Sequence, residues 1–323
     1  MSELASEPSN SAGAADDAEE VTTSPAETEQ PAPRRGGMVA GLVRTARPRQ
    51  WVKNVLVLAA PFTANLIHHG DVLLKCGIAF VSFCLIASAV YLVNDAIDVE
   101  ADRAHPTKRN RPIAAGIVPV PVAYGAAVVL ALASFGVGLM AGWPLLVVLA
   151  VYAAVQLGYC LGWKHQPVID LCIVASGFLL RSIAGGVAAR IPLSQWFLLV
   201  TAFGSLFMVA GKRYAEILLF ERTGAKIRAS LAKYSSSYLR FVWATSAAIM
   251  IMTYGLWAFE IHQHARSVWP VISMVPFTIA VLRYAVDVDG GNAGEPEEIA
   301  LRDRVLQVLG AAWVLTLALS VYL

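Results

Sequence analysis

Charged residues are scarce in this 323-residue chain. Asp, Glu, Lys and Arg together make up 15% of it, whereas hydrophobic residues make up 57%. An ordinary soluble domain carries about 25% charged residues, so the composition excludes that class of protein. Nine apolar runs are each near the length needed to cross a membrane, at residues 51–67, 75–95, 122–141, 144–162, 168–186, 194–211, 239–259, 269–286 and 305–323. We therefore predict an all-α integral membrane bundle of about nine transmembrane helices.

Cysteine and histidine are too few and too scattered to form a metal centre. Each cysteine lies in an apolar run without metal-ligand spacing, as expected of a small buried hydrophobic residue. Two pairs of histidines fall in predicted outer loops and have no third ligand beside them. The residues concerned are Cys76, Cys84, Cys160, Cys172, His68, His69, His262 and His264.

Residues 1–37 lack large apolar side chains and contain eight acidic residues. They also lack the basic and apolar regions of a secretory signal. Such a segment buries too little surface to offset the entropy lost on ordering. We therefore predict a disordered cytoplasmic tail over residues 1–37 and a single transmembrane catalytic domain over residues 38–323.

Positive charge is nearly absent from one side of the predicted bundle. Of the 25 Lys and Arg residues, 21 fall in the N-terminal flank, in alternate loops or at the adjoining helix ends. Cytoplasmic loops carry such an excess of Lys and Arg. We predict a multi-pass protein of the plasma (inner) membrane, with its N-terminus and active site on the cytoplasmic side.

The stretch NDAIDVEAD, residues 94–102, places negative charge directly after the second apolar run. If the helix continues, Asn94, Asp98 and Asp102 lie one turn apart on one face, with Asp95 on the adjoining flank. A carboxylate facing lipid costs roughly 2.5–3.5 kcal/mol, so this face must meet cytosol or a polar cavity. An ordinary solvated helix end is the simpler alternative, but it requires no spacing along a single face.

Oxygen ligands at this spacing suit Mg²⁺, which bridges protein carboxylates to substrate phosphates. The next segment, RAHPTKRNRPIAAG, supplies Arg103, Lys108, Arg109 and Arg111. Guanidinium groups bind phosphate oxygens through paired donors. The two segments together predict a site for a metal-bound diphosphate.

The pattern N-D-x-x-D-x-x-x-D, followed by K-R-x-R-P-I after the second apolar run, resembles the UbiA-type intramembrane prenyltransferase superfamily. This resemblance implies a helical bundle around a cavity that is open to the cytoplasmic side. It also implies that Asn94, Asp98 and Asp102 bind Mg²⁺ and the donor diphosphate and so act in catalysis.

A second aspartate-rich motif, which most members of that superfamily carry after the sixth span, is absent from this chain. The corresponding stretch is GKRYAEILLFERTG, with Lys212, Arg213, Tyr214 and Glu216. Cations in place of carboxylates remove a metal site and create a direct anion site. A positive cluster that only sets the membrane topology is the alternative.

The segments RPRQWVKNVLVLAAP and FGSLFMVAGKRYAE are similar to the phosphoribosyltransferase branch of the superfamily. This similarity implies 5-phosphoribosyl diphosphate as donor and a polyprenyl (decaprenyl) phosphate, held in the lipid bilayer, as acceptor. The product would feed arabinose-donor synthesis for cell-wall arabinan. No nucleic-acid partner is expected, and a homo-oligomer is compatible with this architecture.

Further polar residues inside or beside the apolar runs are candidates for substrate binding. Arg181 lies in mid-span, where an ionisable residue indicates function by default; a structural pair with Asp170 is the alternative. Asp287 and Asp289 are candidates for ribose or metal binding, but a solvated acidic loop over residues 287–298 is favoured. The complete set of substrate-binding candidates is Gln50, Lys53, Asn54, Asp95, Lys108, Arg109, Arg111, Tyr159, Lys164, Arg181, Lys212, Arg213 and Tyr214.

Two other functions are compatible with an intramembrane helical bundle. One is transfer of a prenyl group from a prenyl diphosphate to an aromatic ring, against which the missing second aspartate motif argues. The other is transport of anionic lipids, which requires polar breaks in both halves of the membrane. Because the polar residues crowd onto the cytoplasmic side, an enzyme with one-sided access is favoured.

Overall fold

The computed structural model describes residues 37–224, 231–265, 267–291, 299 and 302–322. All but one residue of the predicted tail lies outside this set, as does the predicted acidic loop from residue 292 to 298. The described residues belong to one compact unit, Gly36–Leu323. They form helices, turns and loops and contain no strand, which confirms the all-α class.

Seven helices of the described chain are long and apolar enough to cross a membrane. They are α3 (Gly70–Ile97), α5 (Val120–Leu139), α6 (Trp143–Leu161), α7 (Ile169–Ala189), α8 (Gln195–Thr223), α9 (Ser236–Ala265) and α10 (Trp269–Asp289). The C-terminal helix α12 (Arg304–Tyr322) has a shorter apolar stretch, Arg304–Ser320. The shorter elements are α1 (Met38–Ala46), η1 (Pro48–Leu58), α2 (Ala59–Thr63), α4 (Val99–Arg103), η2 (Lys108–Asn110), η3 (Trp163–His165) and η4 (Leu231–Lys233).

The first predicted span is not a continuous α-helix. Residues 48–58 form the 3₁₀ helix η1, and only the short helix α2 follows it. Arg47 lies between α1 and η1 and has a φ of 55°, which ends the helical conformation of α1. Pro48 is the first residue of η1. A 3₁₀ run of more than about four residues is uncommon and marks a hinge or a constrained functional segment.

Proline and glycine set the ends of the membrane-spanning helices. Gly142 and Gly162 bracket α6 with φ values of 112° and 141°. Glycine adopts this conformation without the steric cost that a Cβ would bring. Pro144 lies at the start of α6 and has no N–H group. This costs no hydrogen bond, because the first N–H groups of a helix have no intrahelical partner.

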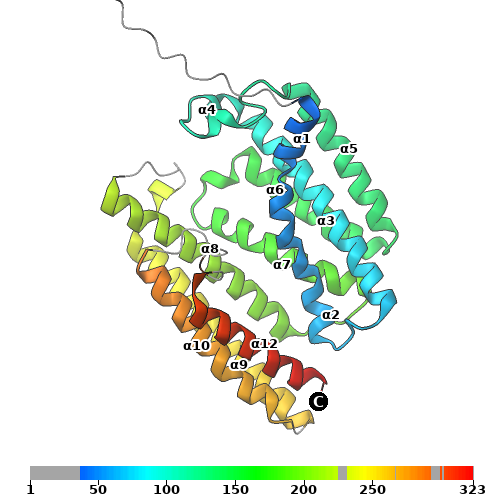
Figure 1. The fold of residues 1–323 in the computed structure, drawn as a ribbon, viewed down its shortest axis with the longest axis vertical. Helices are drawn as coiled ribbons and strands as arrows, with labels where there is room; N and C mark the ends of the chain where they lie inside the picture. Colours follow the sequence, from blue (N-terminus) through cyan, green and yellow to red (C-terminus); the bar gives the residue numbers. More distant parts are fainter. Residues whose placement is uncertain (1–36, 225–230, 266, 292–298, 300–301, 323) are drawn as a thin grey trace, which may run out of the picture. The chain divides into compact units, whose positions relative to one another are not determined.

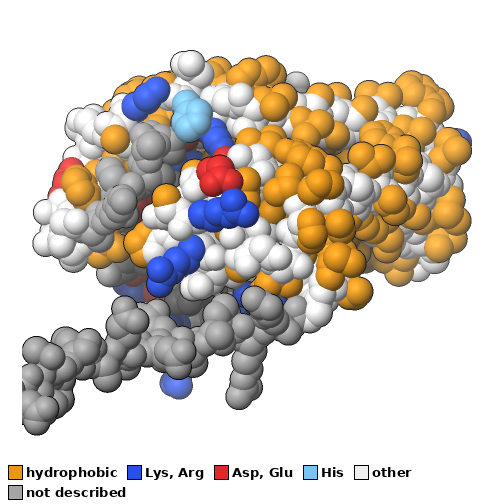
Figure 2. Space-filling view, turned by 90° about the horizontal axis from the view of Figure 1, so that it is seen from above, with side chains coloured by type: hydrophobic (Ala, Val, Ile, Leu, Met, Phe, Trp, Pro, Cys, Tyr) orange, Lys and Arg blue, Asp and Glu red, His pale blue; other side chains and the backbone are white. Residues whose placement is uncertain are grey.

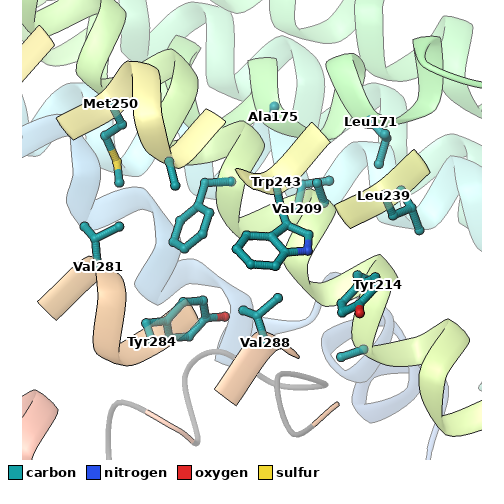
Figure 3. Packing of buried hydrophobic residues seen from close by; sticks show 14 of the residues in the cluster. Leu171, Ala175, Val209, Tyr214, Leu239, Trp243, Met250, Val281, Tyr284 and Val288 are labelled. Carbon is teal, nitrogen blue, oxygen red and sulfur yellow. The ribbon is translucent and has the colours of Figure 1, made fainter. Parts of the chain in front are cut away.

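Two groups of helices make up the bundle (Figure 1). In the first group α3 packs against α5, α6 and α7, and in the second α9 packs against α8 and α10. Contacts between α7 and α8 join the groups. The second group has an aromatic core in which Trp243 lies 6.0 Å from Tyr214 and 6.2 Å from Phe207, between ring centroids (Figure 3).

The segment η1 lies directly against α7 at Gly185. A Cβ at this position would fall 1.7 Å from the backbone carbonyl oxygen of Val57. Only glycine therefore allows η1 to approach α7 so closely. This contact fixes the place of η1, and with it the place of Lys53 and Asn54.

We expect Gly185→Ala to destabilise the protein by about 1–3 kcal/mol, because overpacking at a backbone contact forces the two elements apart. Thermal unfolding of the purified protein measures the effect. Gly125→Ala is the matched control, since a Cβ there has no neighbour within 4 Å. Equal unfolding temperatures for the two variants would show that the close approach of η1 to α7 at Gly185 does not contribute to stability.

Charged side chains gather at the end of the molecule that carries α4. Seen from this end, Lys, Arg, Asp, Glu and His side chains lie together over one part of the surface, and apolar side chains cover much of the remainder (Figure 2). The acidic stretch 94–102 and the basic stretch 103–116 both belong to this end.

Candidate active site

The predicted one-turn spacing of the acidic stretch is present at the end of α3. The helix ends at Ile97, and α4 begins at Val99 after a bend at Asp98. Backbone hydrogen bonds still run from the Asp98 N–H to the Asn94 carbonyl at 3.0 Å and from the Asp102 N–H to the Asp98 carbonyl at 2.8 Å. The helical register therefore survives the bend.

The carboxylates divide into a buried pair and a more open one. Asp95 and Asp102 are 2% and 3% exposed. Arg111 lies 3.1 Å from the carboxylate of Asp95 and 2.7 Å from that of Asp102, and Arg47 lies 2.7 Å from Asp95. These cations relieve the repulsion between the two carboxylates, so the buried pair ties the basic stretch to α3.

Asp98 has a different environment. Its side chain is 28% exposed, and its carboxylate lies 2.6 Å from the ammonium of Lys164, which comes from η3 between α6 and α7. Asn94, one turn earlier, donates to Asp95 at 3.3 Å and accepts from the thiol of Cys160 at 3.6 Å. Asn94, Asp98 and Lys164 are thus brought together from two sides, as the candidate site requires.

The donor atoms of Asn94 and Asp98 fit a hard divalent cation. In the described chain no three His, Cys, Asp or Glu side chains are grouped as a metal site. Mg²⁺ nevertheless needs only one or two carboxylates when waters and substrate phosphates complete its shell. Asn94 and Asp98 supply such a partial set, whereas the carboxylate of Asp102 is engaged by Arg111.

The predicted basic residues 108–111 do not act alike. Lys108 and Arg109 are exposed, and their side chains make no ion pair or hydrogen bond with the rest of the described chain. Arg111 is held by the buried carboxylates. Arg103 pairs with Glu100 at 2.7 Å and donates to a backbone carbonyl. Lys108 and Arg109 are therefore the cations of this stretch that are available to an anion.

Arg181 occupies the interior of the first helix group and is 7% exposed. Its guanidinium donates to the Asn54 side chain at 2.7 Å, to the Gly177 carbonyl and to the Tyr152 hydroxyl at 3.1 Å. All three acceptors are neutral. Lys53, near the same place, lies 5.9 Å from the ring centroid of Phe178.

The alternative pairing of Arg181 with Asp170 is wrong, because Asp170 belongs to Arg213. Asp170 and Arg213 are 1% and 4% exposed, and their charged atoms lie 3.4 Å apart. The Tyr234 hydroxyl donates a short hydrogen bond to the same aspartate. Asp170 lies 11 residues, or three helical turns, before Arg181 on α7. Arg213 and Arg181 therefore contact different parts of this helix.

The predicted anion cluster over residues 212–214 is divided by the helix that contains it. The helix α8 continues to Thr223, so residues 212–214 are helical and face different directions. The side chains of Arg213 and Tyr214 are buried in the protein. Tyr214 is 1% exposed, accepts from Arg240 at 2.6 Å and lies 3.3 Å from Asp289. Lys212 is partly exposed and forms no ion pair within the described residues.

The predicted acidic loop over residues 287–298 begins too early, because α10 continues to Asp289. Asp289 is exposed and pairs with Arg240 at 3.0 Å. Gln50 and Tyr159 are partly exposed, and their side chains make no hydrogen bond to the described residues. Sequence analysis missed Arg47, Tyr152 and Tyr234. Tyr152 lies two helical turns before Tyr159 on α6, and this spacing could have identified it.

A second feature lies at the opposite end of the bundle from α4, beside α2. It is a cavity of about 550 Å³ lined almost entirely by apolar and aromatic side chains. The lining comes from α2, residues 191–194, the start of α8 and the C-terminal halves of α9 and α12, and includes Phe62, Trp196, Val200, Trp257 and Trp313.

The chain is similar to known proteins in both sequence and fold. Residues 55–302 match the UbiA prenyltransferase family. A decaprenyl-phosphate phosphoribosyltransferase from Mycolicibacterium smegmatis is 61% identical over 298 residues, which cover 88% of this chain and 93% of that protein. The enzyme of the same name from Mycobacterium tuberculosis is 62% identical over 288 residues, with coverages of 88% and 95%. A UbiA homologue from Archaeoglobus fulgidus, solved with GPP and Mg²⁺, shares the fold at a TM-score of 0.66 and 14% identity, covering 88% of this chain and 100% of its own.

Proposed function

The chain belongs to the UbiA prenyltransferase family, and we propose that it transfers 5-phosphoribose from 5-phosphoribosyl diphosphate to a polyprenyl (decaprenyl) phosphate in the membrane. The observation that carries the proposal is the extent of the likeness. Named decaprenyl-phosphate phosphoribosyltransferases are about 60% identical to this chain over 88% of it and over more than nine-tenths of their own length. The product would serve arabinose-donor synthesis for cell-wall arabinan.

The reaction exchanges one bond at C1 of the ribose. The bond from C1 to the diphosphate oxygen breaks, and its electron pair leaves with the diphosphate. An oxygen of the lipid phosphate supplies the electron pair for the new bond to C1. The lipid phosphate is ionised at neutral pH, so no strong general base is required. Positioning and electrostatic stabilisation therefore supply most of the rate enhancement.

Asn94, Asp98 and Lys164 are the residues we assign to the diphosphate. A bound Mg²⁺ would supply Lewis-acid stabilisation of the leaving diphosphate. Asn94 and Asp98 would hold that ion, and Lys164, released from Asp98, would neutralise a phosphate oxygen. Asp102 and Asp95 hold Arg111 and the basic stretch in place, while Lys108 and Arg109 remain available to phosphate groups.

Arg181 extends the site into the membrane interior. A buried guanidinium is costly unless an anion compensates it, and the partners of Arg181 in the described chain are neutral. The donor carries a 5-phosphate, and the acceptor carries a phosphate of its own. Either one would provide the missing anion. Asn54 and Lys53 lie beside Arg181, and we assign Gln50, Tyr159 and Lys212 to the same substrates.

The finer membrane topology is also part of the proposal. The broken segment η1–α2 and the helix α12 would complete the nine crossings, with the cavity and N-terminus on the cytoplasmic side of the plasma membrane. The asymmetric distribution of Lys and Arg and the charged end of the molecule support this orientation (Figure 2).

The apolar cavity beside α2 suits the isoprenoid chain of the acceptor, because its aromatic and aliphatic lining matches hydrocarbon. We expect Val200→Trp, which fills the cavity, to raise KM for decaprenyl phosphate about tenfold and to leave turnover of a short-chain farnesyl phosphate acceptor nearly unchanged. Leu199→Trp is the matched control on the neighbouring, outward-facing position. Equal kinetics for both variants with the long acceptor would remove the cavity from the acceptor site.

The choice of donor tests the proposed function. Purified protein with Mg²⁺ is offered labelled 5-phosphoribosyl diphosphate with decaprenyl phosphate or, separately, labelled geranyl diphosphate with an aromatic acid. Label in the lipid product of the first mixture alone is expected. Transfer in the second mixture alone would place the chain among prenyltransferases that act on aromatic acceptors.

A further inference from the structure

The turn between α6 and α7 carries Lys164, the cation that meets the acidic stretch. The Lys164 ammonium lies 2.6 Å from the carboxylate of Asp98. Lys164 lies in η3, whose backbone hydrogen bonds run within residues 162–166. These bonds do not include Pro167 and Val168, which connect η3 to α7 at Ile169. The place of Lys164 therefore depends on what holds the turn.

The turn contains an unfavourable backbone conformation at Val168, with φ 69° and ψ −49°. These angles are close to those of a classic γ-turn, which is rare and strained. The branched Cβ of valine makes positive φ less accessible still. Such a conformation persists only when its surroundings enforce it, and it often occurs next to functional groups.

Two consecutive residues before α9 make the enforcing contacts. The Tyr234 hydroxyl accepts a hydrogen bond from the Val168 N–H at 2.6 Å. The Lys233 ammonium donates to the His165 carbonyl at 2.6 Å. The two contacts hold the turn at His165, the residue after Lys164, and at Val168.

The Tyr234 hydroxyl is itself held from the other side. It donates to Asp170, whose carboxylate pairs with Arg213 of α8. Burial raises the pKa of the Tyr234 hydroxyl, and its hydrogen bond to Asp170 acts in the same direction. The hydroxyl therefore keeps its proton at neutral pH and can donate to Asp170 while it accepts from Val168.

We propose that Tyr234 is a positioning residue of the transfer reaction: its hydroxyl holds Val168 in the strained turn and so keeps Lys164 next to Asp98, within reach of the donor diphosphate when that binds. The assignment of Lys164 to the diphosphate rests on the proposed function. The hold of Tyr234 on the turn does not, and it is measured separately.

Tyr234→Phe removes the hydroxyl and keeps the ring, which stacks on Tyr238 at 5.8 Å between centroids. Tyr238→Phe is a matched control, because the Tyr238 hydroxyl makes no hydrogen bond to the described chain. The two variants lose the same atom from neighbouring rings. A difference between them therefore reports the hydroxyl of Tyr234.

Amide hydrogen exchange of the full chain in detergent tests the hold on the turn. The N–H groups of Asp170 and Cys172 bond to the carbonyls of Gln166 and Val168. We expect both to exchange about tenfold faster in Tyr234→Phe and at the wild-type rate in Tyr238→Phe. Wild-type exchange in Tyr234→Phe would overturn the proposal, whether or not the protein proves to be a phosphoribosyltransferase.

A double-mutant cycle tests the action through Lys164. Tyr234→Phe should lower kcat/KM for 5-phosphoribosyl diphosphate about ten- to a hundredfold, mainly through KM. In a Lys164→Gln background the same change should have almost no further effect. Additive losses would overturn the proposal, whereas an inactive wild type would instead refute the proposed function.

A rescue separates positioning from general damage. Glycine adopts positive φ at little cost, so Val168→Gly should restore most of the activity lost in Tyr234→Phe. A misfolded or loosely packed variant gains nothing from that second change. Failure of the rescue, with normal insertion of both variants, would show that the strained turn is not the element on which Tyr234 acts.

Discussion

Asp98→Asn is expected to lower the rate of transfer about a hundred- to a thousandfold, because it removes the open carboxylate that would share Mg²⁺ with the donor diphosphate. The amide keeps the shape of the side chain and can still accept from Lys164, so expression and membrane insertion should remain normal. Turnover of the purified variant, measured across a range of Mg²⁺ concentrations, checks the prediction.

The matched control is Asp71→Asn at the other end of the same helix. Asp71 is exposed and lies 4.0 Å from Lys75, a pairing of the kind that contributes little. Asp102→Asn should also reduce activity, but by freeing Arg111 and loosening the basic stretch, and so with a loss of stability. Normal turnover in Asp98→Asn would remove the metal-site assignment.

Arg181→Gln is expected to lower kcat/KM about a hundredfold, since it deletes the buried cation that would bind a substrate phosphate. Its hydrogen-bond partners are neutral, so the substitution leaves no buried charge without a partner. The unfolding temperature should therefore stay within about 4 °C of the wild-type value. Steady-state kinetics and thermal unfolding of the same preparation measure both quantities.

Asp170→Asn provides the contrast on the same helix. It leaves the buried Arg213 without its carboxylate and should destabilise the protein by about 3–5 kcal/mol. If Arg181→Gln unfolded as readily as Asp170→Asn while keeping its kcat/KM, Arg181 would be a structural residue and the deeper phosphate site would be lost.

Much of the fold could be read from the sequence. The limits of α5, α6 and α10 lie within a few residues of the predicted apolar runs, because hydrophobicity and the flanking prolines and glycines determine where such helices end. The helical spacing of Asn94, Asp98 and Asp102 was also predictable, since it depends only on local backbone geometry.

The failures have a common physical origin in long-range contacts. The run 51–67 is apolar enough for a helix, but the contact of η1 with Gly185 and the bond between Asn54 and Arg181 hold it in another conformation. From the sequence alone, the stretch GKRYAE is predicted to present Lys212 and Arg213 as cations available to an anion. Because α8 extends 12 residues beyond the predicted end at 211, Arg213 reaches Asp170 instead.

Polar partners that are distant along the chain were equally inaccessible to sequence reasoning. Lys164 and Asp98 are 66 residues apart, and Arg181 and Asn54 are 127 residues apart. Periodicity along one helix cannot say which residue of another helix will face it. The acidic stretch therefore predicted a site, whereas its division into Asp95 with Asp102 and Asn94 with Asp98 required the structure.

One measurement tests the central claim most directly. The protein in lipid nanodiscs is given decaprenyl phosphate and 5-phosphoribosyl diphosphate, and both released diphosphate and the phosphoribosylated lipid are quantified. We predict one diphosphate for each lipid product, with both stopped by EDTA and both restored by added Mg²⁺. Diphosphate release without the lipid product, or lipid product that persists in EDTA, would contradict the account.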